Sequence, residues 1–484
     1  MSSLEKQKPN TKFHRGSYSR LSEKQTQDLH NASLEILESI GVELEYDGAI
    51  DLLKKAGAVV LDNGLVRIPH KLVEGALNTV PKEFTLYNRL GDPAMRLSGD
   101  RSYFGPGSDC LNIIDHRTGE RRKPVLNDVA EGIRLCDALP NIDFVMSMVL
   151  PTDVNQAIAD TYQMEVILEN TVKPIIVVSY ETQGLIDAVE MAEAVVGGPK
   201  ALAEKPILTC YINVISGTVH NQDGLRKLFY LAEKGLPVLY IPGSNAGMTS
   251  PATMAGAVAL DNAGALAGLT LTQLVNPGTP VIWSAMDSAS LDMRTMVSPY
   301  AYPERGIMRA MARYYDLPAF ALAGGTDAKI VDQQAAAEAS LTLLADVMMG
   351  GNIIHDLGYL ESGLTFSFAQ LVITNEIVDW IKAFQREIEV SEETLALDVV
   401  REVGVHGQFL AHPHTRQHYR KIWYPDLFER GYYTDWEAQG SQSLAERAAK
   451  RVQDILDKHT VEPLPNDVKK KLKEIVQRAA CNPS

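Results

Sequence analysis

The sequence predicts an α/β fold in which eight strand–helix units form a (β/α)8 TIM barrel, with an N-terminal helical segment and a C-terminal extension. From about residue 100 to residue 389, short apolar runs alternate with longer helical patterns. These runs lack alternating polar residues, as expected for strands that are buried on both faces. Eight such units in series favour a barrel over a doubly wound open sheet, which usually stops near about six strands.

The composition is that of an ordinary globular protein, with 484 residues, 45% hydrophobic and 22% charged. The formal net charge of −15 argues against a nucleic-acid partner, because a phosphate backbone is bound by basic surfaces. The cysteines are far apart and form no C-x-x-C pair, so we interpret them as reduced thiols; they are Cys110, Cys136, Cys210 and Cys481.

No membrane segment is predicted. The most apolar stretch, residues 263–275, is shorter than a bilayer span and rich in alanine and glycine. The polar N-terminus has no apolar core of a signal peptide. We therefore expect a cytoplasmic protein with no membrane partner.

The chain begins with a polar stretch, residues 1–20, that we expect to be a flexible arm. Residues 21–99 are predicted to form a helical cap. In it, apolar residues recur at helical spacing up to Gly41, and further helices are expected at about 47–56 and 70–79. No chemistry is evident in this part of the sequence.

The barrel is expected to occupy residues 100–389. Its predicted strands, in order, are 102–104, 144–149, 175–179, 207–212, 238–241, 281–284, 319–323 and 353–355. Its predicted helices are 126–138, 155–170, 183–196, 222–234, 251–275, 301–315, 330–349 and 369–388.

The C-terminal extension, residues 390–484, shows no strand–helix alternation, and helices are expected around 442–458 and 466–479. It is rich in aromatic residues of the kind that are common in interface cores, so we expect it to join copies into a homo-oligomer, with packing on the chain's own barrel as the alternative; these residues are Trp423, Tyr424, Tyr432, Tyr433 and Trp436.

An active site in such a barrel is expected on the loops that follow the strands. These loops offer no lysine suited to Schiff-base chemistry apart from Lys329, no paired histidines on the first strand and no complete phosphate-binding fingerprint. What remains is largely aromatic: Tyr103, Phe104, Tyr180, Tyr211, Trp283, Tyr300, Tyr359, Phe366 and Phe368. Aromatic faces around an apolar pocket bind quaternary ammonium ions, although core packing is the alternative for each ring taken alone.

Polar candidates complete the list. His355 closes the last strand and is expected to contact a ligand at the barrel mouth or, alternatively, to be a core histidine. Arg309 and Arg313 are candidates for binding a substrate carboxylate, although arginines in mid-helix usually face solvent. A metal-dependent lyase using His355, Asp356 and Asp327 is the alternative enzyme, and we predict no metal site.

Six stretches of the sequence resemble the trimethylamine methyltransferase family, whose members are corrinoid-dependent enzymes built on a (β/α)8 barrel. They are LEILESIGVE (34–43), VRIPHKLVEGALNTVPKEFTLYNR (66–89), FGPGSD (104–109), GGTDAKIVDQQAAAEA (324–339), DLGYLESGLTFSFAQLVITNEI (356–377) and FLAHPHTRQHYRKIWYPDLFERG (409–431). The resemblance implies an enzyme that moves a methyl group from an amine to the Co(I) of a corrinoid (cobalamin) supplied by a cognate corrinoid protein.

The founding members of that family carry pyrrolysine in the segment that matches residues 332–336, which here read Asp-Gln-Gln-Ala-Ala. This departure implies a quaternary amine in place of trimethylamine, with glycine betaine as the first expectation. Proline betaine, carnitine and γ-butyrobetaine are alternatives, as is a quaternary-amine binding protein without methyl transfer.

The resulting prediction assigns no side chain a certain catalytic role. The predicted substrate contacts are Tyr103, Phe104, Tyr211, Trp283, His355, Phe366, Arg309 and Arg313. The predicted contacts to the partner's corrinoid are Gly324, Gly325, Asp327 and Gln334.

Overall fold

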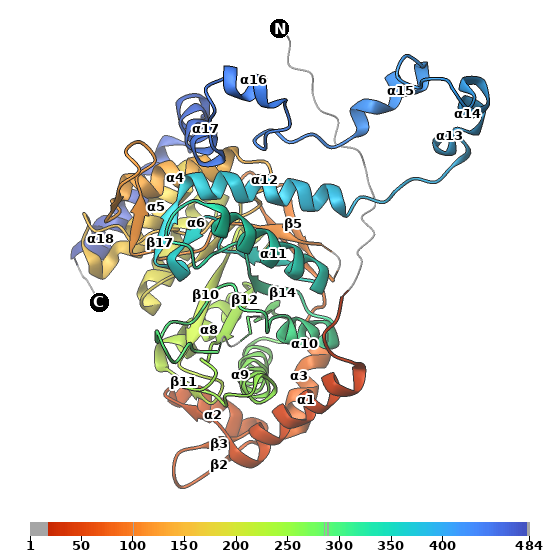
Figure 1. Ribbon diagram of the computed structural model, residues 1–484. Helices are drawn as coiled ribbons and strands as arrows, with labels where there is room; N and C mark the ends of the chain where they lie inside the picture. The colour runs from red at the N-terminus through yellow and green to blue at the C-terminus, as the bar shows by residue number, and fades with distance from the viewer. Residues whose placement is uncertain (1–17, 100, 285, 288–289, 482–484) are drawn as a thin grey trace.

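The computed structural model describes residues 18–99, 101–284, 286–287 and 290–481, and its centre is a curled parallel sheet of seven strands (Figure 1). The strands lie in the order β6-β15-β14-β13-β12-β10-β9. Their bounds are β6 Tyr103–Phe104, β9 Ile175–Val177, β10 Leu208–Val214, β12 Val238–Pro242, β13 Val281–Ser284, β14 Ala319–Leu322 and β15 Ile353–His355. Seven of the eight predicted strands are thus confirmed.

The eighth predicted strand, at 144–149, is an irregular segment. The Asp143 amide donates to Phe104 O at 2.6 Å on one outer strand, and Ile176 of the other outer strand donates to Val145 O at 2.9 Å. Met148 has a left-handed backbone with φ of 61°, which prevents a regular ladder here. The segment therefore bonds to both edges of the sheet, and the regular eight-stranded barrel that the sequence predicts is observed only in part.

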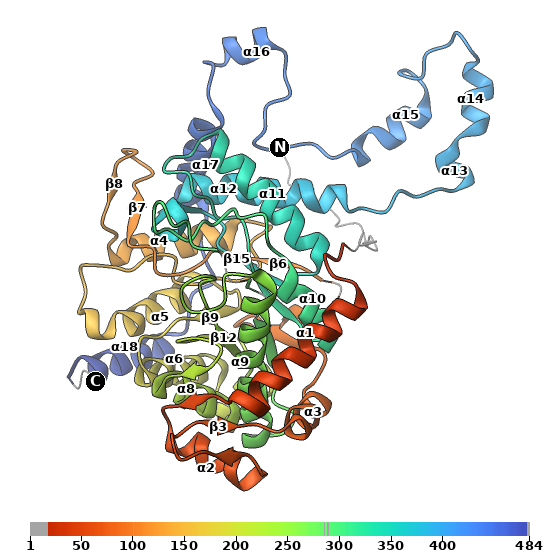
Figure 2. The same cartoon turned by 60° about the horizontal axis from the view of Figure 1, so that its bottom comes forward.

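Helices pack around the outer face of this sheet (Figure 1, Figure 2). A helix is present at each of the eight positions where the sequence predicts one for the barrel. They are α4 Leu126–Ala138, α5 Ala159–Asn170, α6 Thr182–Val196, α8 Gln222–Glu233, α9 Met254–Val275, α10 Ile307–Tyr315, α11 Gln333–Met349 and α12 Phe368–Phe384. Side chains define several of the ends. Asp332 and Ser367 accept backbone hydrogen bonds at the starts of α11 and α12, and Gly350 ends α11 with φ of 96°.

The interior of the sheet is filled from one end by a hairpin of β4 (Phe84–Tyr87) and β5 (Pro93–Leu97). Side chains of this hairpin pack among inward-facing residues of the strands; the buried cluster is Leu86, Met95, Leu97, Phe144, Met146, Ile176, Leu239, Ile241, Ile282, Phe320 and Ile353. The hairpin lies within residues 21–99, so that region is not purely helical as the sequence suggested. It closes the N-terminal end of the sheet.

The N-terminal helices α1 (Glu23–Glu35), α2 (Asp47–Ala56) and α3 (His70–Thr79) pack against α9 (Figure 2). Helix α9 has the length and apolarity of a membrane span, but 78% of its most apolar window is buried inside the fold. It is therefore a core helix of the fold. Tyr18 donates its amide to Met348 O at 3.0 Å, so the described end of the expected arm is attached, while residues 1–17 lie outside the described residues.

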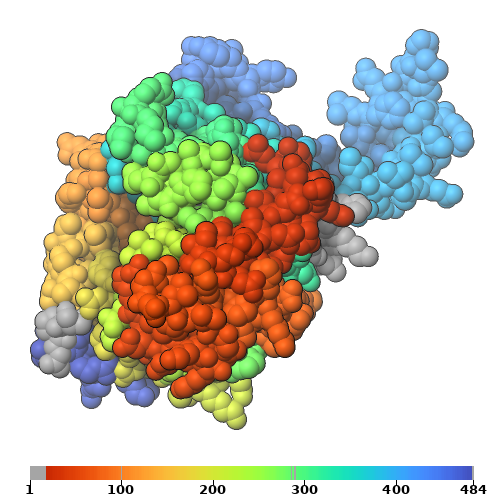
Figure 3. Space-filling view, turned by 90° about the horizontal axis from the view of Figure 1, so that it is seen from below, coloured from red at the N-terminus to blue at the C-terminus, as the bar shows by residue number. Residues whose placement is uncertain are grey.

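The C-terminal extension has two parts. Helices α17 (Leu444–Lys458) and α18 (Asn466–Cys481) confirm both expected helices and pack against α12, α4, α5 and α6. Before them, residues 385–422 form an arm that projects away from the body (Figure 1, Figure 3). Residues 423–428 return to α12, where Trp423 stacks on Trp380 with ring centroids 5.9 Å apart and the Leu427 amide donates to Glu376 at 2.9 Å. The arm contains α13 (Glu392–Leu395), α14 (Leu397–Val403) and α15 (Pro413–His418).

Candidate active site

The C-terminal end of the sheet is open, whereas its N-terminal end is closed by the β4–β5 hairpin. Asn213 lies two residues beyond the inward-facing Tyr211 on β10 and therefore shares its face. Asn213 and Gly243, at the ends of neighbouring strands, are exposed even though the strands themselves are buried. The loops at this end are therefore the natural place for a site.

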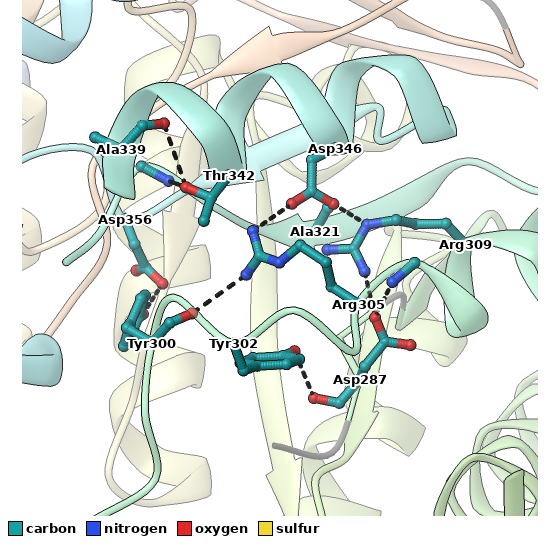
Figure 4. Close-up of polar contacts among 12 residues, drawn as sticks. Asp287, Tyr300, Tyr302, Arg305, Arg309, Ala321, Ala339, Thr342, Asp346 and Asp356 are labelled. Atoms are coloured by element: carbon teal, nitrogen blue, oxygen red, sulfur yellow. Dashed lines mark hydrogen bonds and ion pairs between the residues drawn. The ribbon is translucent and has the colours of Figure 1, made fainter. Parts of the chain in front are cut away.

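A buried carboxylate stands at the end of β15. Asp356 is 2% exposed, and its backbone is left-handed with φ of 86°. It accepts a short hydrogen bond from the Tyr300 hydroxyl (Figure 4), and its Oδ2 lies 3.4 Å from His355 Nε2. Burial raises the pKa of Asp356, while His355 and the hydroxyls of Tyr300 and Tyr359 oppose that rise.

His355 is fixed in one orientation on the same strand. Its Nδ1 lies 2.8 Å from Ala321 O, and a carbonyl can only accept, so Nδ1 carries a proton. Its ring stacks on Phe320 with centroids 4.1 Å apart, and the Tyr211 ring lies 6.4 Å away. In the neutral ring Nε2 is thus the free base, on the side of Asp356.

A second carboxylate follows β6. Asp109 also has a left-handed backbone, with φ of 62°, and accepts a hydrogen bond from Ser147 Oγ at 3.2 Å. Burial, with a smaller contribution from Asp160, raises the pKa of Asp109 to about 6, against the effect of hydrogen bonds from Ser147 and Ser108. Non-glycine residues in this conformation are costly and concentrate at functional sites, and Met148 beside them shares it.

Aromatic side chains join these two carboxylates. Tyr300 and Tyr359 pack with ring centroids 6.1 Å apart, and the Tyr359 hydroxyl donates to Ser108 O. Besides burial, the charges of Asp356 and Asp109 both raise the pKa of Tyr211, which places this ring near both carboxylates. Three phenols, one imidazole and two carboxylates therefore meet at the open end of the sheet.

Two glycines make room for this arrangement. A Cβ on Gly107 would collide with the Asp356 carboxylate and with the Tyr359 ring. A Cβ on Gly325 would lie 2.5 Å from Cε1 of Tyr300. We expected Gly324 and Gly325 to contact the corrinoid, but Gly325 supports the Tyr300 ring, and Gly324 forms a turn with φ of 89°.

The other two residues that we predicted to contact the corrinoid are Asp327 and Gln334. Asp327 accepts the Tyr300 amide at 2.8 Å and the Ser362 hydroxyl at 2.7 Å, so it holds the site loops together. Gln334 is exposed at the start of α11 and bonds to Glu338 at 2.9 Å. Of the four residues, Gln334 is the exposed one, and Asp327 is partly exposed.

A buried ion-pair network anchors the loop that carries Tyr300 (Figure 4). Arg309 Nη1 lies 2.7 Å from Asp287 Oδ2, and Arg309 also pairs with Asp346. Arg305 donates to Asp346 at 3.0 Å and to Tyr300 O at 3.3 Å. Arg309 therefore neither faces solvent nor is free to bind a substrate carboxylate, because it is buried and paired with two aspartates of the protein itself.

Arg313 lies at the other end of α10 and donates to Met349 O at 3.1 Å, the last residue of α11. Because α11 begins near the site loops and runs away from them, this contact places Arg313 at the far end of the sheet from Asp356. The structure does not bring either predicted arginine into the cluster of tyrosines.

Strand alternation corrects two of the predicted aromatic contacts. Trp283 packs against Tyr315 of α10 with ring centroids 4.8 Å apart, and Lys382 of α12 lies 5.4 Å over the Phe104 ring. Both rings therefore face the helical layer, because successive side chains on a strand point to opposite faces.

Two further aromatic residues that we predicted to contact the substrate, Tyr103 and Phe366, also lie outside the cluster. Tyr103 faces inward but begins β6, where its hydroxyl accepts the Arg96 amide at 3.0 Å at the closed end. Phe366 lies behind Tyr359 with ring centroids 6.1 Å apart. Tyr211 and His355 are the predicted contacts that the structure places together at the open end.

The residues that complete the cluster were visible in the sequence only as members of longer sets. Tyr300 and Tyr359 stood among nine aromatics, and Asp109 and Asp356 among the residues that follow strands. Their distinguishing feature is backbone geometry and long-range contact, neither of which has a signal in a single sequence.

Comparison with known proteins identifies the family. The family model described as "Trimethylamine methyltransferase (MTTB)" matches residues 2–482. The chain belongs to the trimethylamine methyltransferase family. It is 34% identical over 454 residues to the trimethylamine methyltransferase MttB of Desulfitobacterium hafniense strain DCB-2, covering 93% of this chain and 91% of that protein. It is also 31% identical over 466 residues to the glycine betaine methyltransferase of Desulfitobacterium hafniense strain Y51, covering 95% of this chain and 96% of that protein.

Solved structures agree on the fold of this methyltransferase. The Methanosarcina barkeri monomethylamine methyltransferase MtmB aligns with a TM-score of 0.51 at 13% identity, covering 95% of this chain and 89% of that one. At that identity the likeness concerns the fold. The trimethylamine methyltransferase family is an enzyme family, and the motifs 104–109, 324–339 and 356–377 that suggested it contain Gly107, Asp109, Gly325 and Asp356 of the observed cluster.

Proposed function

We propose that the chain transfers a methyl group from a quaternary amine, with glycine betaine as the expected donor, to the Co(I) of a corrinoid carried by a cognate protein. The observation that carries this proposal is the cluster of tyrosines and carboxylates at the open end of the sheet, in which no arginine or lysine bonds to a phenol or carboxylate group among the described residues. Aromatic rings and carboxylates both stabilise a cation.

The chemistry asks little of the protein beyond binding and positioning. A quaternary nitrogen leaves as a neutral tertiary amine, so no general acid has to protonate it. A reduced corrinoid supplies the nucleophile when the partner is bound. The chain must hold one N-methyl group toward the opening and exclude water, which is the type of contribution that positioning makes. The hydroxyls of Tyr300 and Tyr359 are already engaged, and this fixes their rings.

The carboxylate of a betaine needs a donor, and the structure narrows the candidates. Arg309 and Arg313 have partners within the fold. His355 Nε2 is the predicted contact that lies within the cluster, and a protonated His355 would donate to a carboxylate. Proline betaine, carnitine and γ-butyrobetaine differ from glycine betaine in the position of that carboxylate, so they are the first alternatives.

The segment that matches the pyrrolysine position supports a quaternary donor. Asp332 caps α11 by accepting the Ala335 amide at 3.1 Å, Ala335 is buried, and the two glutamines between them are exposed. The resemblance implies that pyrrolysine orients or activates a neutral amine. The side chains at this position offer no electrophile that could do the same.

The observed geometry does not support the alternative function of a metal-dependent lyase. The Asp327 carboxylate is used by Tyr300 and Ser362, and no group of three or more histidine, cysteine, aspartate or glutamate side chains suited to a metal occurs within the described ranges. The non-catalytic binding protein stays as the alternative, since the cluster binds a cation in either case.

One assay separates these possibilities. The protein is mixed with a reduced cognate corrinoid protein and with trimethylamine, choline or a betaine, and the methyl-cobalt spectrum is followed. Methyl-cobalt formed from a quaternary amine supports the proposal. Binding of the amine without methyl-cobalt formation supports the binding protein instead.

The same proposal places the corrinoid protein at the open end of the sheet, with the exposed Gln334 as a contact. It also places the enzyme in the cytoplasm. It includes closure of the barrel by residues 143–149, which bond to both outer strands. Cross-linking of the partner to the hairpin end would contradict the docking surface.

A further inference from the structure

We propose that Asp109 and Asp356 are the residues that recognise the positive charge of the amine, and that cation binding is coupled to release of a proton from this pair. The inference rests on the proposed function for the location of the site. It adds which groups read the charge of the substrate and what happens to their protons.

The first argument is a contrast with three buried carboxylates that pair with arginines. Asp346 and Asp287 pair with Arg305 and Arg309, and Asp128 lies 2.7 Å from Arg122. Buried charges are normally compensated in this way, because transfer from water is costly. Asp109 and Asp356 instead receive hydroxyl groups and the imidazole of His355.

The second argument is that both carboxylates face the same residues. Each of them raises the pKa of Tyr211 and of Tyr359, after burial, which is the main cause. Asp356 and Asp109 likewise raise the pKa of the buried Cys110 thiol. Burial favours the protonated form of both carboxylates, against the effect of their hydroxyl donors and, for Asp356, of His355.

The titratable and polar groups that face each carboxylate are as follows. Asp109 faces Ser108, Ser147, Asp160, Tyr180, Tyr211, Tyr359 and Cys110. Asp356 faces His355, Tyr300, Tyr359, Cys110 and Tyr211. His355 is the basic group among these neighbours. A quaternary ammonium ion would therefore be the main compensating charge in the site.

The direction of the coupling follows from the pKa of Asp109, which is about 6 in the empty site. A bound cation favours the ionised carboxyl and lowers that pKa. Binding therefore releases a proton when the pH is below about 6 and releases little well above it, so affinity rises with pH through this range. An affinity profile alone does not identify the carboxylates, because the imidazole of His355 also faces Asp356.

Pairs of isosteres test the recognition of charge directly. Choline and its neutral carbon analogue 3,3-dimethylbutan-1-ol have the same shape, as do glycine betaine and 3,3-dimethylbutanoate. We expect the wild-type protein to bind each ammonium compound roughly tenfold or more tightly than its carbon analogue. Asp109→Asn and Asp356→Asn should lose most of that ratio.

The control variant is Asp62→Asn, which removes one negative charge from an exposed turn after β2 (Val59–Val60) and should keep the ratio. Circular dichroism and thermal unfolding verify that each variant is folded, and Asp109→Glu should restore part of the preference if Asp109→Asn is unstable. Equal ratios in wild type, Asp109→Asn and Asp356→Asn would overturn the inference.

Calorimetry measures the proton. Titration of choline and of glycine betaine in two buffers of different ionisation enthalpy should show release approaching one proton at about pH 5.5 and close to none at about pH 8. Asp109→Asn should reduce the release. No buffer dependence at either pH, or no binding of either cation, would overturn the inference.

These outcomes are separate from those of the methyl-cobalt assay. Charge-selective binding with proton release but no methyl-cobalt would leave the inference standing and refute the proposed function. If the protein transfers a methyl group to the corrinoid, but neither substitution changes its preference for binding the ammonium compounds, the proposed function stands and the inference is refuted.

Discussion

The Tyr300 hydroxyl donates a hydrogen bond to the carboxylate of Asp356, and this bond joins the long loop after β13 to the turn after β15. The two residues are 56 positions apart in the chain. The loop is held from behind by Arg305, which donates to Tyr300 O and pairs with Asp346 (Figure 4). The position of an aromatic ring in the site thus depends on a buried ion pair outside it.

Substitution of Tyr300 by phenylalanine should weaken binding of a quaternary amine while leaving the fold intact. The Asp356 carboxyl loses a hydrogen bond that opposes the rise in its pKa, so its charged form becomes less populated. The expected loss is about 0.5–1.5 kcal/mol of binding free energy, measured by calorimetry at neutral pH.

The matched control is Tyr302→Phe, which removes the bond from Tyr302 to Asp287 O at 2.9 Å in the same loop. It should cost similar stability but leave amine affinity unchanged. Equal losses of affinity in both variants would show that Tyr300 acts only by stabilising the loop.

Gly325→Ala should abolish most of the amine binding. The added methyl group would lie 2.5 Å from the Tyr300 ring, and the ring would have to move away from Asp356. Gly75→Ala in α3 is the control, because its Cβ meets nothing within 4 Å. Normal affinity of Gly325→Ala would contradict the placement of Tyr300.

Arg309→Ala should destabilise the whole protein more than it changes substrate preference. It leaves Asp287 and Asp346 buried with one cation fewer, a change that typically costs about 3–5 kcal/mol. Urea unfolding measures the loss. A stable variant that had lost selective affinity for betaines over choline would restore the original expectation that Arg309 binds a substrate carboxylate.

The arm of residues 385–422 should join copies of the chain. Ile388, Val405 and Leu410 are 85%, 95% and 84% exposed, and exposed apolar groups of this kind mark interfaces. Helix α12 starts beside the open end at Phe368 and runs away from it, so the arm leaves that end free for the corrinoid protein. A second copy is therefore the occupant we expect.

Light scattering at micromolar concentration tests this expectation. The wild-type chain should be a homo-oligomer, and Val405→Ser combined with Leu410→Ser should shift it toward monomer without altering amine affinity. A monomeric wild-type protein would contradict it.

The sequence predicted most of the elements because their signals are local. Buried strands such as 238–241 read as unbroken apolar runs, and helices such as α4 and α18 follow from the spacing of their apolar residues. The hairpin at 84–97 was missed because it fills the interior of the sheet, where its apolar residues resemble those of any core element.

The site was predicted only in part, for physical reasons. Strand ends located the open face, but a shift of one residue sends a ring such as Trp283 to the helical layer. Arg309 could not be assigned because its partners, Asp287 and Asp346, come from other elements. The pairing of Tyr300 with Asp356 likewise depends on how a long loop folds back.

The methyl-cobalt spectrum across trimethylamine, choline and several betaines is the most direct test of the central claim. A quaternary nitrogen is permanently activated, whereas protonated trimethylamine loses its activation with its proton. The account predicts methyl-cobalt formation with a quaternary amine, a betaine before choline, and little with trimethylamine. Turnover of trimethylamine comparable to that of the best betaine would contradict it.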